Sequence, residues 1–200
     1  MKYVVYPDLP PPLIDQSTIQ LDNTPDIGRC ATVTQGEHAI TGLRNHRYAL
    51  NFENYDWKKW VCENIADDYS SIVMSHHGPE LETIANPVGT IIPHTDGIRD
   101  WGLLWLTDLG GENVETVFWQ EQDQPIYRGR SIISPTVRGS NTKITTYNTL
   151  TELHRVNLPV GRWVLLNVGV IHSVENITST RKALHINFEN DSQFIKKWCS

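Results

Sequence analysis

Two histidines and one aspartate have the residue types and the spacing of a metal site. His94 and Asp96 are separated by one residue, so on an extended chain their side chains point the same way and can bind one ion. His172 lies far along the chain and must reach that ion from another strand. Two histidines and a carboxylate can occupy one face of an octahedral metal and leave the opposite face open, as in non-haem Fe(II) sites. The sequence therefore predicts an iron site at His94, Asp96 and His172.

An arginine that follows the second histidine suggests what binds beside the metal. If Arg181 faces the interior of a barrel, it needs an anionic partner, because an unpaired buried charge is very costly. A dicarboxylate would balance the charge that remains on Fe(II), Asp96 and Arg181 together, and arginine binds a carboxylate through two parallel hydrogen bonds. We therefore expect a 2-oxoacid that chelates the metal at one end and meets Arg181 at the other. The alternative is an ordinary surface arginine.

Short apolar runs separated by turn residues predict a β-rich domain that could position these side chains. The runs occur at 70–75, 80–85, 90–94, 101–106, 114–119, 143–148, 162–168, 170–174 and 182–188. Many short strands at this spacing indicate an antiparallel sandwich or barrel. A parallel α/β fold would need helices between the strands, and the segments between these runs leave no room for them.

One of these runs indicates which side of its strand lines the site. In 181–188 the mostly polar odd-numbered positions, which include Arg181 and His185, alternate with even-numbered positions that are apolar apart from Lys182. The apolar side should pack against neighbouring structure. A polar side that faced solvent would be ordinary, but the metal residues favour a polar side that faces the mouth of a barrel.

The residues before 70 predict a supporting layer for the barrel. In 54–68, Trp57, Trp60, Val61 and Ile65 fall at helical spacing and give one apolar stripe, as in a helix that packs on a sheet. We expect a single domain over residues 1–200. Within it, 1–69 would be a support segment with flanking N-terminal helices, and 70–190 would be the catalytic core.

Composition excludes several classes of protein. The chain of 200 residues has a formal net charge of −6 and no long run of Lys or Arg, which disfavours a nucleic-acid partner bound through a broad basic face. No stretch approaches the ~20 apolar residues of a membrane helix, and the proline-rich start is not a signal peptide. Its three cysteines lack CxxC spacing, as expected for reduced thiols in a cytoplasmic protein. The oligomeric state is open.

The motifs resemble those of the Fe(II)/2-oxoglutarate-dependent dioxygenases, which share a double-stranded β-helix, or jelly-roll, core. Residues 86–97, NPVGTIIPHTDG, resemble the turn and strand that lead to the family's HxD motif. Residues 170–188, VIHSVENITSTRKALHINF, resemble its HxV…TRxA segment. The spacing is most similar to prolyl-hydroxylase-type members, and the HxV…N pattern resembles aspartyl/asparaginyl β-hydroxylase-like members. The matched stretch covers about residues 70–190.

The resemblance implies a reaction and a set of roles. His94, Asp96 and His172 would bind Fe(II), and Arg181 would bind the distal carboxylate of 2-oxoglutarate. O₂ and 2-oxoglutarate would be consumed and succinate and CO₂ released, while a C–H bond of a peptidyl residue, an amino acid or another small molecule is hydroxylated. Halogenase relatives lack the carboxylate ligand, so Asp96 favours hydroxylation.

Two further residues are candidates for binding the co-substrate. Trp105 lies where prolyl-hydroxylase-like members place a tyrosine that donates to the distal carboxylate, and an indole N–H can also donate. The alternative for Trp105 is a core aromatic. His185 shares the polar side of its strand with Arg181. The substrate is open: Arg99 and Asp100 are candidates for the mouth of the site, and 120–141 is either a lid or a solvated loop.

Other classes of protein are compatible with the same residues. A cupin-type metal-binding protein would share the jelly roll, although its first motif is HxH where this chain has HTD at 94–96. A non-catalytic jelly-roll binding module is a third class. An AlkB-like demethylase would carry a second arginine where this chain has Asn187, and a zinc hydrolase is possible on ligand type alone.

Overall fold

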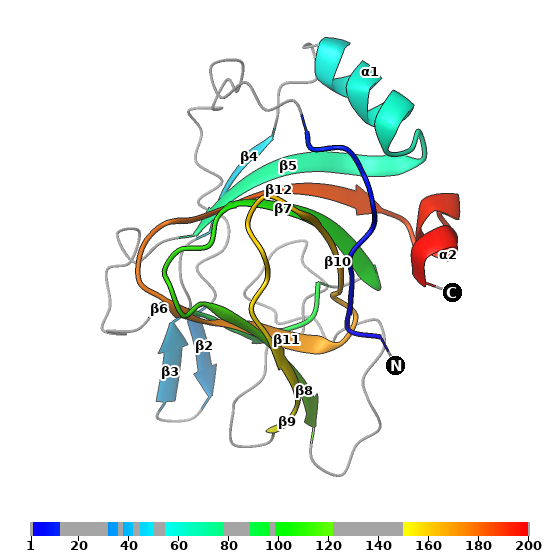
Figure 1. Ribbon diagram of the computed structural model, residues 1–200. Coiled ribbons are helices and arrows are strands. Elements are labelled where there is room, and N and C mark those ends of the chain that lie inside the picture. Colours follow the sequence, from blue (N-terminus) through cyan, green and yellow to red (C-terminus); the bar gives the residue numbers. More distant parts are fainter. Residues whose placement is uncertain are drawn as a thin grey trace.

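Two antiparallel sheets form the centre of the described part of the protein in a computed structural model (Figure 1). The structure describes residues 2–12, 32–35, 38–41, 45–49, 55–77, 89–96, 99–121 and 150–199. Its helices and strands are β1 (Val4–Val5), β2 (Thr32–Gln35), β3 (His38–Thr41), β4 (Asn45–Ala49), α1 (Tyr55–Asn64), β5 (Tyr69–His77), β6 (Gly89–His94), β7 (Trp101–Asp108), β8 (Glu115–Glu121), β9 (Leu150–Val156), β10 (Trp163–Asn167), β11 (Ile171–Ile177), β12 (Arg181–Phe188) and α2 (Gln193–Cys199).

The order of the strands is that of a double-stranded β-helix. The larger sheet has the order β1-β10-β7-β12-β5-β4, and the smaller sheet has the order β6-β11-β8-β9. From β5 to β12 the chain passes back and forth between the two sheets, so strands that are neighbours in a sheet are mostly distant in the sequence. β2 and β3 pair with each other in a separate two-stranded ribbon. The predicted mainly β, jelly-roll fold is confirmed.

Most of the predicted apolar runs are strands in the structure. Seven of the nine correspond to β5, β6, β7, β8, β10, β11 and β12. The other two, at 80–85 and 143–148, lie outside the described residues, as does most of the loop 120–141. β9 was not predicted, because the solvent-exposed positions that dominate this strand leave no apolar alternation to detect.

Two helices cover the outer face of the larger sheet (Figure 1). The helix predicted within 54–68 is confirmed as α1, and Val61 on it is fully buried against the sheet. The second helix, α2, is C-terminal rather than N-terminal, and it buries Phe194 and Ile195 in the same cluster. Ser192 caps it, since its Oγ accepts hydrogen bonds from Phe194 N and Ile195 N. In the described part of the chain, no helix is long and apolar enough to cross a membrane.

The larger sheet separates two apolar cores, and this fixes the direction of each side chain on β12. Leu184 and Ile186 belong to the outer core beneath the helices. Ala183 belongs to the inner core between the sheets, together with Leu104 and Leu106 of β7. Because side chains alternate along a strand, the odd-numbered positions of β12 face the space between the two sheets. The polar side predicted for this strand therefore faces the interior.

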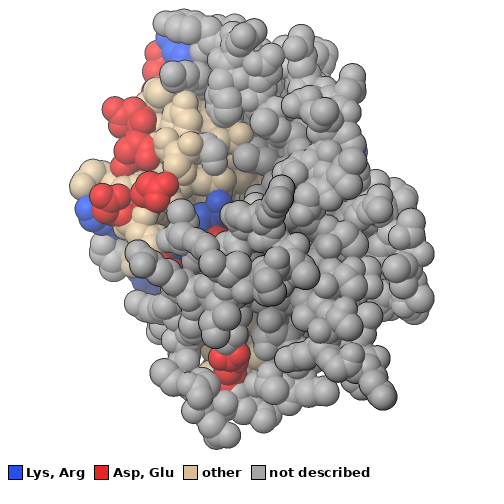
Figure 2. Space-filling model, turned by 180° about the vertical axis from the view of Figure 1, so that it is seen from behind, with Lys and Arg blue, Asp and Glu red and all other residues tan. Residues whose placement is uncertain are grey.

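Exposed acidic residues gather where the ends of α1 and α2 approach each other. These residues are Asp67, Asp68, Glu189 and Asp191. Asp68 Oδ2 accepts a hydrogen bond of 2.7 Å from Gln193 N, which ties the turn after α1 to the start of α2. Figure 2 shows Asp and Glu side chains gathered on this side of the molecule. This surface therefore carries a local concentration of negative charge.

Candidate metal centre

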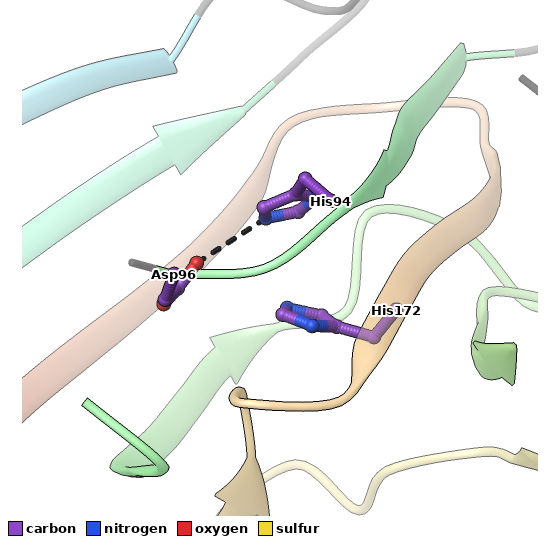
Figure 3. Close-up of side chains that lie close together, drawn as sticks. All are labelled: His94, Asp96 and His172. Carbon is purple, nitrogen blue, oxygen red and sulfur yellow. Dashed lines mark ion pairs between the residues drawn. The ribbon is translucent and has the colours of Figure 1, made fainter. Parts of the chain in front are cut away.

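The three predicted ligands meet between the ends of two neighbouring strands of the smaller sheet (Figure 3). His94 ends β6, Asp96 follows it, and His172 is paired with His94 across the antiparallel β6–β11 ladder. One possible ligand atom from each residue lies within 4.8 Å of the others. The two imidazole rings are 4.4 Å apart between centroids, and His94 Nε2 is 3.3 Å from Asp96 Oδ1. This is the only such group of three among the described residues.

His172 is held in the state that a metal ligand requires. Its Nδ1 lies 3.0 Å from the carbonyl oxygen of Val170, so Nδ1–H donates to that carbonyl and the Nε2 lone pair is left for an ion. Burial, helped by the neighbouring His94, lowers the pKa of His172 to about 4, although Asp96 opposes the shift. The imidazole is therefore neutral at pH 7 and can donate its lone pair to a metal.

Asp96 is held ionised. Burial by itself would raise its pKa, but the Arg99 guanidinium, a hydrogen bond from His94 and the nearby His172 outweigh burial and hold the pKa well below the usual range. Two imidazole nitrogens and one carboxylate oxygen form a donor set that suits Fe(II), and also Zn²⁺. The chemistry of the three side chains thus fits a divalent transition metal.

Backbone contacts tie the segment after Asp96 to the turn before His172. Asp96 N donates to Val168 O at 3.0 Å, and Gly169 N donates to Asp100 O at 3.1 Å. A Cβ on Gly169 would lie only 3.1 Å from the Asp100 Cα and 2.7 Å from its Oδ1, so the glycine permits this close approach. The two segments that carry the candidate ligands are therefore fixed to each other beyond the ends of β6 and β11 as well.

Arg181 is buried at the start of β12. Its side chain lies on the face of the larger sheet that looks toward the smaller one, and only 4% of the residue is exposed. Among the described residues it has no ion pair, and its Nε has no hydrogen-bond partner. Burial lowers the pKa of Arg181 to about 10, so the guanidinium remains charged at neutral pH. The interior thus contains a cation whose counter-charge is not supplied by the described residues.

A glycine turn packs against the backbone of Arg181. Gly110 has a φ of 85°, and a Cβ there would lie 2.7 Å from the Cβ of Arg181. The carbonyl of Gly110 accepts hydrogen bonds from Thr178 N and Ser179 N at 2.8 and 2.9 Å. The β7–β8 turn therefore holds the residues that lead into β12 and sets where Arg181 enters the interior.

The two other predicted co-substrate residues lie on opposite sides of the larger sheet. His185 faces the interior, as predicted, and its Nε2 is hydrogen-bonded to the buried Ser75 Oγ. Trp105 packs in the outer core, with its ring centroid 5.3 Å from that of Trp163. The structure therefore does not bring Trp105 to Arg181: the odd-numbered positions of β7 face the helices, and Trp105 is a core aromatic.

Sequence reasoning named Arg99 only as a candidate for the mouth of the site. In the structure it contacts a predicted ligand directly, since its Nη2 lies 2.6 Å from Asp96 Oδ2. No role was predicted for Gly169, although its closeness to Asp100 shapes the site. A basic residue three positions after an aspartate in a loop was the available signal for Arg99. The glycine left no signal, because only the folded chain shows what lies beside it.

No protein-family profile and no curated protein matches the chain. Among solved structures it is similar to E. coli ycfD, with 10% identity over 80% of this chain and 41% of that chain and a TM-score of 0.40. It is similar to procruciferin, an 11S globulin from Brassica napus, with 10% identity over 90% of this chain and 32% of that chain and a TM-score of 0.38. It is also similar to an oxalate oxidase, with 13% identity over 96% of this chain and 76% of that chain and a TM-score of 0.36. The chain thus spans less than half of the first two proteins, and scores this low carry no argument about activity.

The contact between Gly169 and Asp100 predicts the effect of one added methyl group. In Gly169→Ala the new Cβ would force Asp100 and the segment from Asp96 away from the turn, so we expect Co²⁺ affinity to fall by about tenfold, as when a group that orients a ligand is lost. Titration followed by visible absorption measures this. Gly102→Ala is the matched control, because its Cβ would meet Val168 at an ordinary 3.6 Å. Equal affinity in the two variants would contradict the expectation.

Proposed function

We propose that this protein is an Fe(II)- and 2-oxoglutarate-dependent dioxygenase that hydroxylates a C–H bond of a peptidyl residue, an amino acid or another small molecule. The observation that carries the proposal is the combination, within one jelly roll, of a two-histidine, one-carboxylate group and a buried arginine on the facing sheet. Succinate and CO₂ would be the products formed from 2-oxoglutarate. The similarity of the motifs to those of this enzyme family supports the same conclusion.

The protonation of His172 and Asp96, and the number of protein ligands, support a metal with positions left open. His172 is neutral and Asp96 is ionised, so neither needs to lose a proton when an ion binds at neutral pH. Three protein donors fill half of an octahedral shell and leave the other half for co-substrate and O₂. A structural zinc site would normally be closed by four protein ligands, and the group found among the described residues has three.

The state of Arg181 supports an anionic co-substrate. A guanidinium taken out of water without a partner costs several kcal/mol, so a buried arginine of this kind calls for a counter-ion. A carboxylate fits because arginine can hold both of its oxygens at once. This separates the proposal from a cupin-type or zinc-hydrolase site, since neither of these requires a buried cation facing the metal residues.

The roles of the chain's own residues follow from these positions. The Val170 carbonyl orients the His172 ring, and Asp96 supplies the anionic ligand. Arg181 would hold the distal carboxylate of 2-oxoglutarate. The apolar side chains of the inner core, among them Phe118, whose ring centroid is 6.3 Å from that of His172, exclude water from one side of the site. The bound iron and 2-oxoglutarate supply the oxidising chemistry.

The proposed reaction is tested by succinate formation. Wild-type protein given Fe(II), 2-oxoglutarate and O₂ should form succinate, since many such reactions proceed slowly without the second substrate, and a substrate screen should increase the rate. Asp96→Ala should abolish succinate formation while the far-UV circular dichroism stays unchanged, because the loss removes a ligand at the end of a strand. Asp191→Ala, an exposed acidic residue, is the control. Full activity in Asp96→Ala would overturn the assignment of the ligands.

Arg181→Met separates the co-substrate from the metal. Removing a charge-assisted hydrogen bond should raise the 2-oxoglutarate concentration needed for half-maximal rate by about 10- to 100-fold, with Fe(II) affinity kept. In the ligand-free protein the melting temperature should rise, because a buried and unpaired charge is replaced by an apolar side chain. Arg162→Met, at an exposed arginine that lies over the Tyr6 ring, is the control. An unchanged 2-oxoglutarate requirement would mean that another group holds the distal carboxylate.

A further inference from the structure

The two carboxylate oxygens of Asp96 have different neighbours. Oδ1 faces His94, with 3.3 Å between it and His94 Nε2, as the dashed line in Figure 3 shows. Oδ2 accepts a hydrogen bond of 2.6 Å from Arg99 Nη2. The oxygen nearer the histidines is therefore the one available to an ion, and the other oxygen is occupied by a cation.

We propose that Arg99 is a positioning residue that keeps Asp96 Oδ2 away from the metal, so that Asp96 binds through Oδ1 alone. The inference rests on the metal-binding part of the proposed function. It assigns a distinct task to an arginine whose guanidinium contacts the carboxylate of a proposed ligand, Asp96. Arg99 would thereby determine how many coordination positions of the metal the protein occupies.

The ion pair between Arg99 and Asp96 is protected from water. The side chains are 17% and 18% exposed, so solvent screens them much less than a surface pair. A comparison is available within the chain. Arg155 contacts Glu115, Glu152 and Glu175 at 2.7, 2.8 and 3.2 Å, but its side chain is 33% exposed. The Arg99 contact is as short as any of these and is more buried, as expected of a contact that fixes one oxygen.

The backbone holds Arg99 at this distance. Asp96 N is bonded to Val168 O, and the next residue after Arg99, Asp100, donates its N–H to Asn190 Oδ1 at 2.7 Å. The segment is thus anchored immediately on both sides of the ion pair. Arg99 Nε is buried and has no hydrogen-bond partner among the described residues, so no bond through Nε draws the guanidinium away from Asp96.

The consequence concerns the open half of the coordination shell. A carboxylate can bind a metal through one oxygen or through both. With one oxygen from Asp96 and one nitrogen from each histidine, three of six octahedral positions stay open, which is the number that a chelating 2-oxoacid and O₂ need together. If Asp96 bound through both oxygens, one of the three would be lost. Arg99 would thus preserve the position on which oxygen chemistry depends.

Metal-bound water provides a direct count of open positions. Mn²⁺ bound to the wild-type protein without co-substrate should hold three waters, and proton relaxation of the solvent reports their number. In Arg99→Met the freed Oδ2 should displace one of them, so the relaxation due to bound water should fall by about a third, while Mn²⁺ affinity changes by less than about threefold. Arg99→Leu serves the same purpose if Arg99→Met does not fold.

Two further variants show whether the hydrogen bond itself is responsible. Arg99→Lys should restore the wild-type relaxation, because the contact consists of one donor on one oxygen and an ammonium can supply that donor. Arg155→Met, which removes an arginine paired with carboxylates away from the site, should leave the relaxation unchanged.

The outcomes separate this inference from the proposed function. Unchanged relaxation in Arg99→Met, with Mn²⁺ bound, would overturn the inference and leave the metal site intact. Loss of Mn²⁺ binding in Arg99→Met would also overturn it, since Arg99 would then be needed to hold the ligand and not to limit it. Absence of Mn²⁺ binding in the wild-type protein would overturn the proposed metal site itself.

Discussion

The antiparallel pairing of β6 with β11 is the constraint on which the site depends, because it sets His94 opposite His172. The two strands are far apart in the sequence, and neither histidine can reach the other without this register. A shift by one residue would turn the side chains of one strand to the other face of the sheet. Among the described strands β6 lies at the edge of its sheet, a position that tolerates Pro93. The bond from Asp96 N to Val168 O continues the attachment beyond the end of the strand.

The facing sheet contributes a charge that the described residues leave unbalanced. The alternation of β12 directs Leu184 and Ile186 into the core under the helices, and this turns Arg181 to the interior. Burial of the apolar side is thus what directs the guanidinium toward the smaller sheet, which carries His94 and His172. The same packing that stabilises the fold therefore keeps a charged group in the interior. The two arginines differ in their partners: Arg99 pairs with the carboxylate of Asp96, whereas the Arg181 Nε has no hydrogen-bond partner among the described residues.

The β-rich fold, the grouping of His94, Asp96 and His172, and the inward direction of β12 could be predicted from the sequence, because each rests on spacing or alternation along the chain. The role of Trp105 could not be predicted in this way. Its residue type permits both roles, and only the register of β7 against β12 decides that it faces the helices. Arg99 and Gly169 act through contacts between loops, which no local pattern records. α2 escaped prediction because it is short and its apolar side becomes evident only once Phe194 lies stacked against Phe188, with 4.6 Å between the ring centroids.

The most direct test of the account is the binding of 2-oxoglutarate to Fe(II)-loaded protein without oxygen, followed by visible absorption. A 2-oxoacid that chelates Fe(II) through its carboxylate and keto oxygen gives a weak charge-transfer band. The account predicts this band in the wild-type protein, its loss in Asp96→Ala, and its recovery in Arg181→Met only at much higher 2-oxoglutarate concentration. No band in wild-type protein that is shown to hold iron would contradict the account and would favour a jelly-roll metal protein that does not use 2-oxoglutarate.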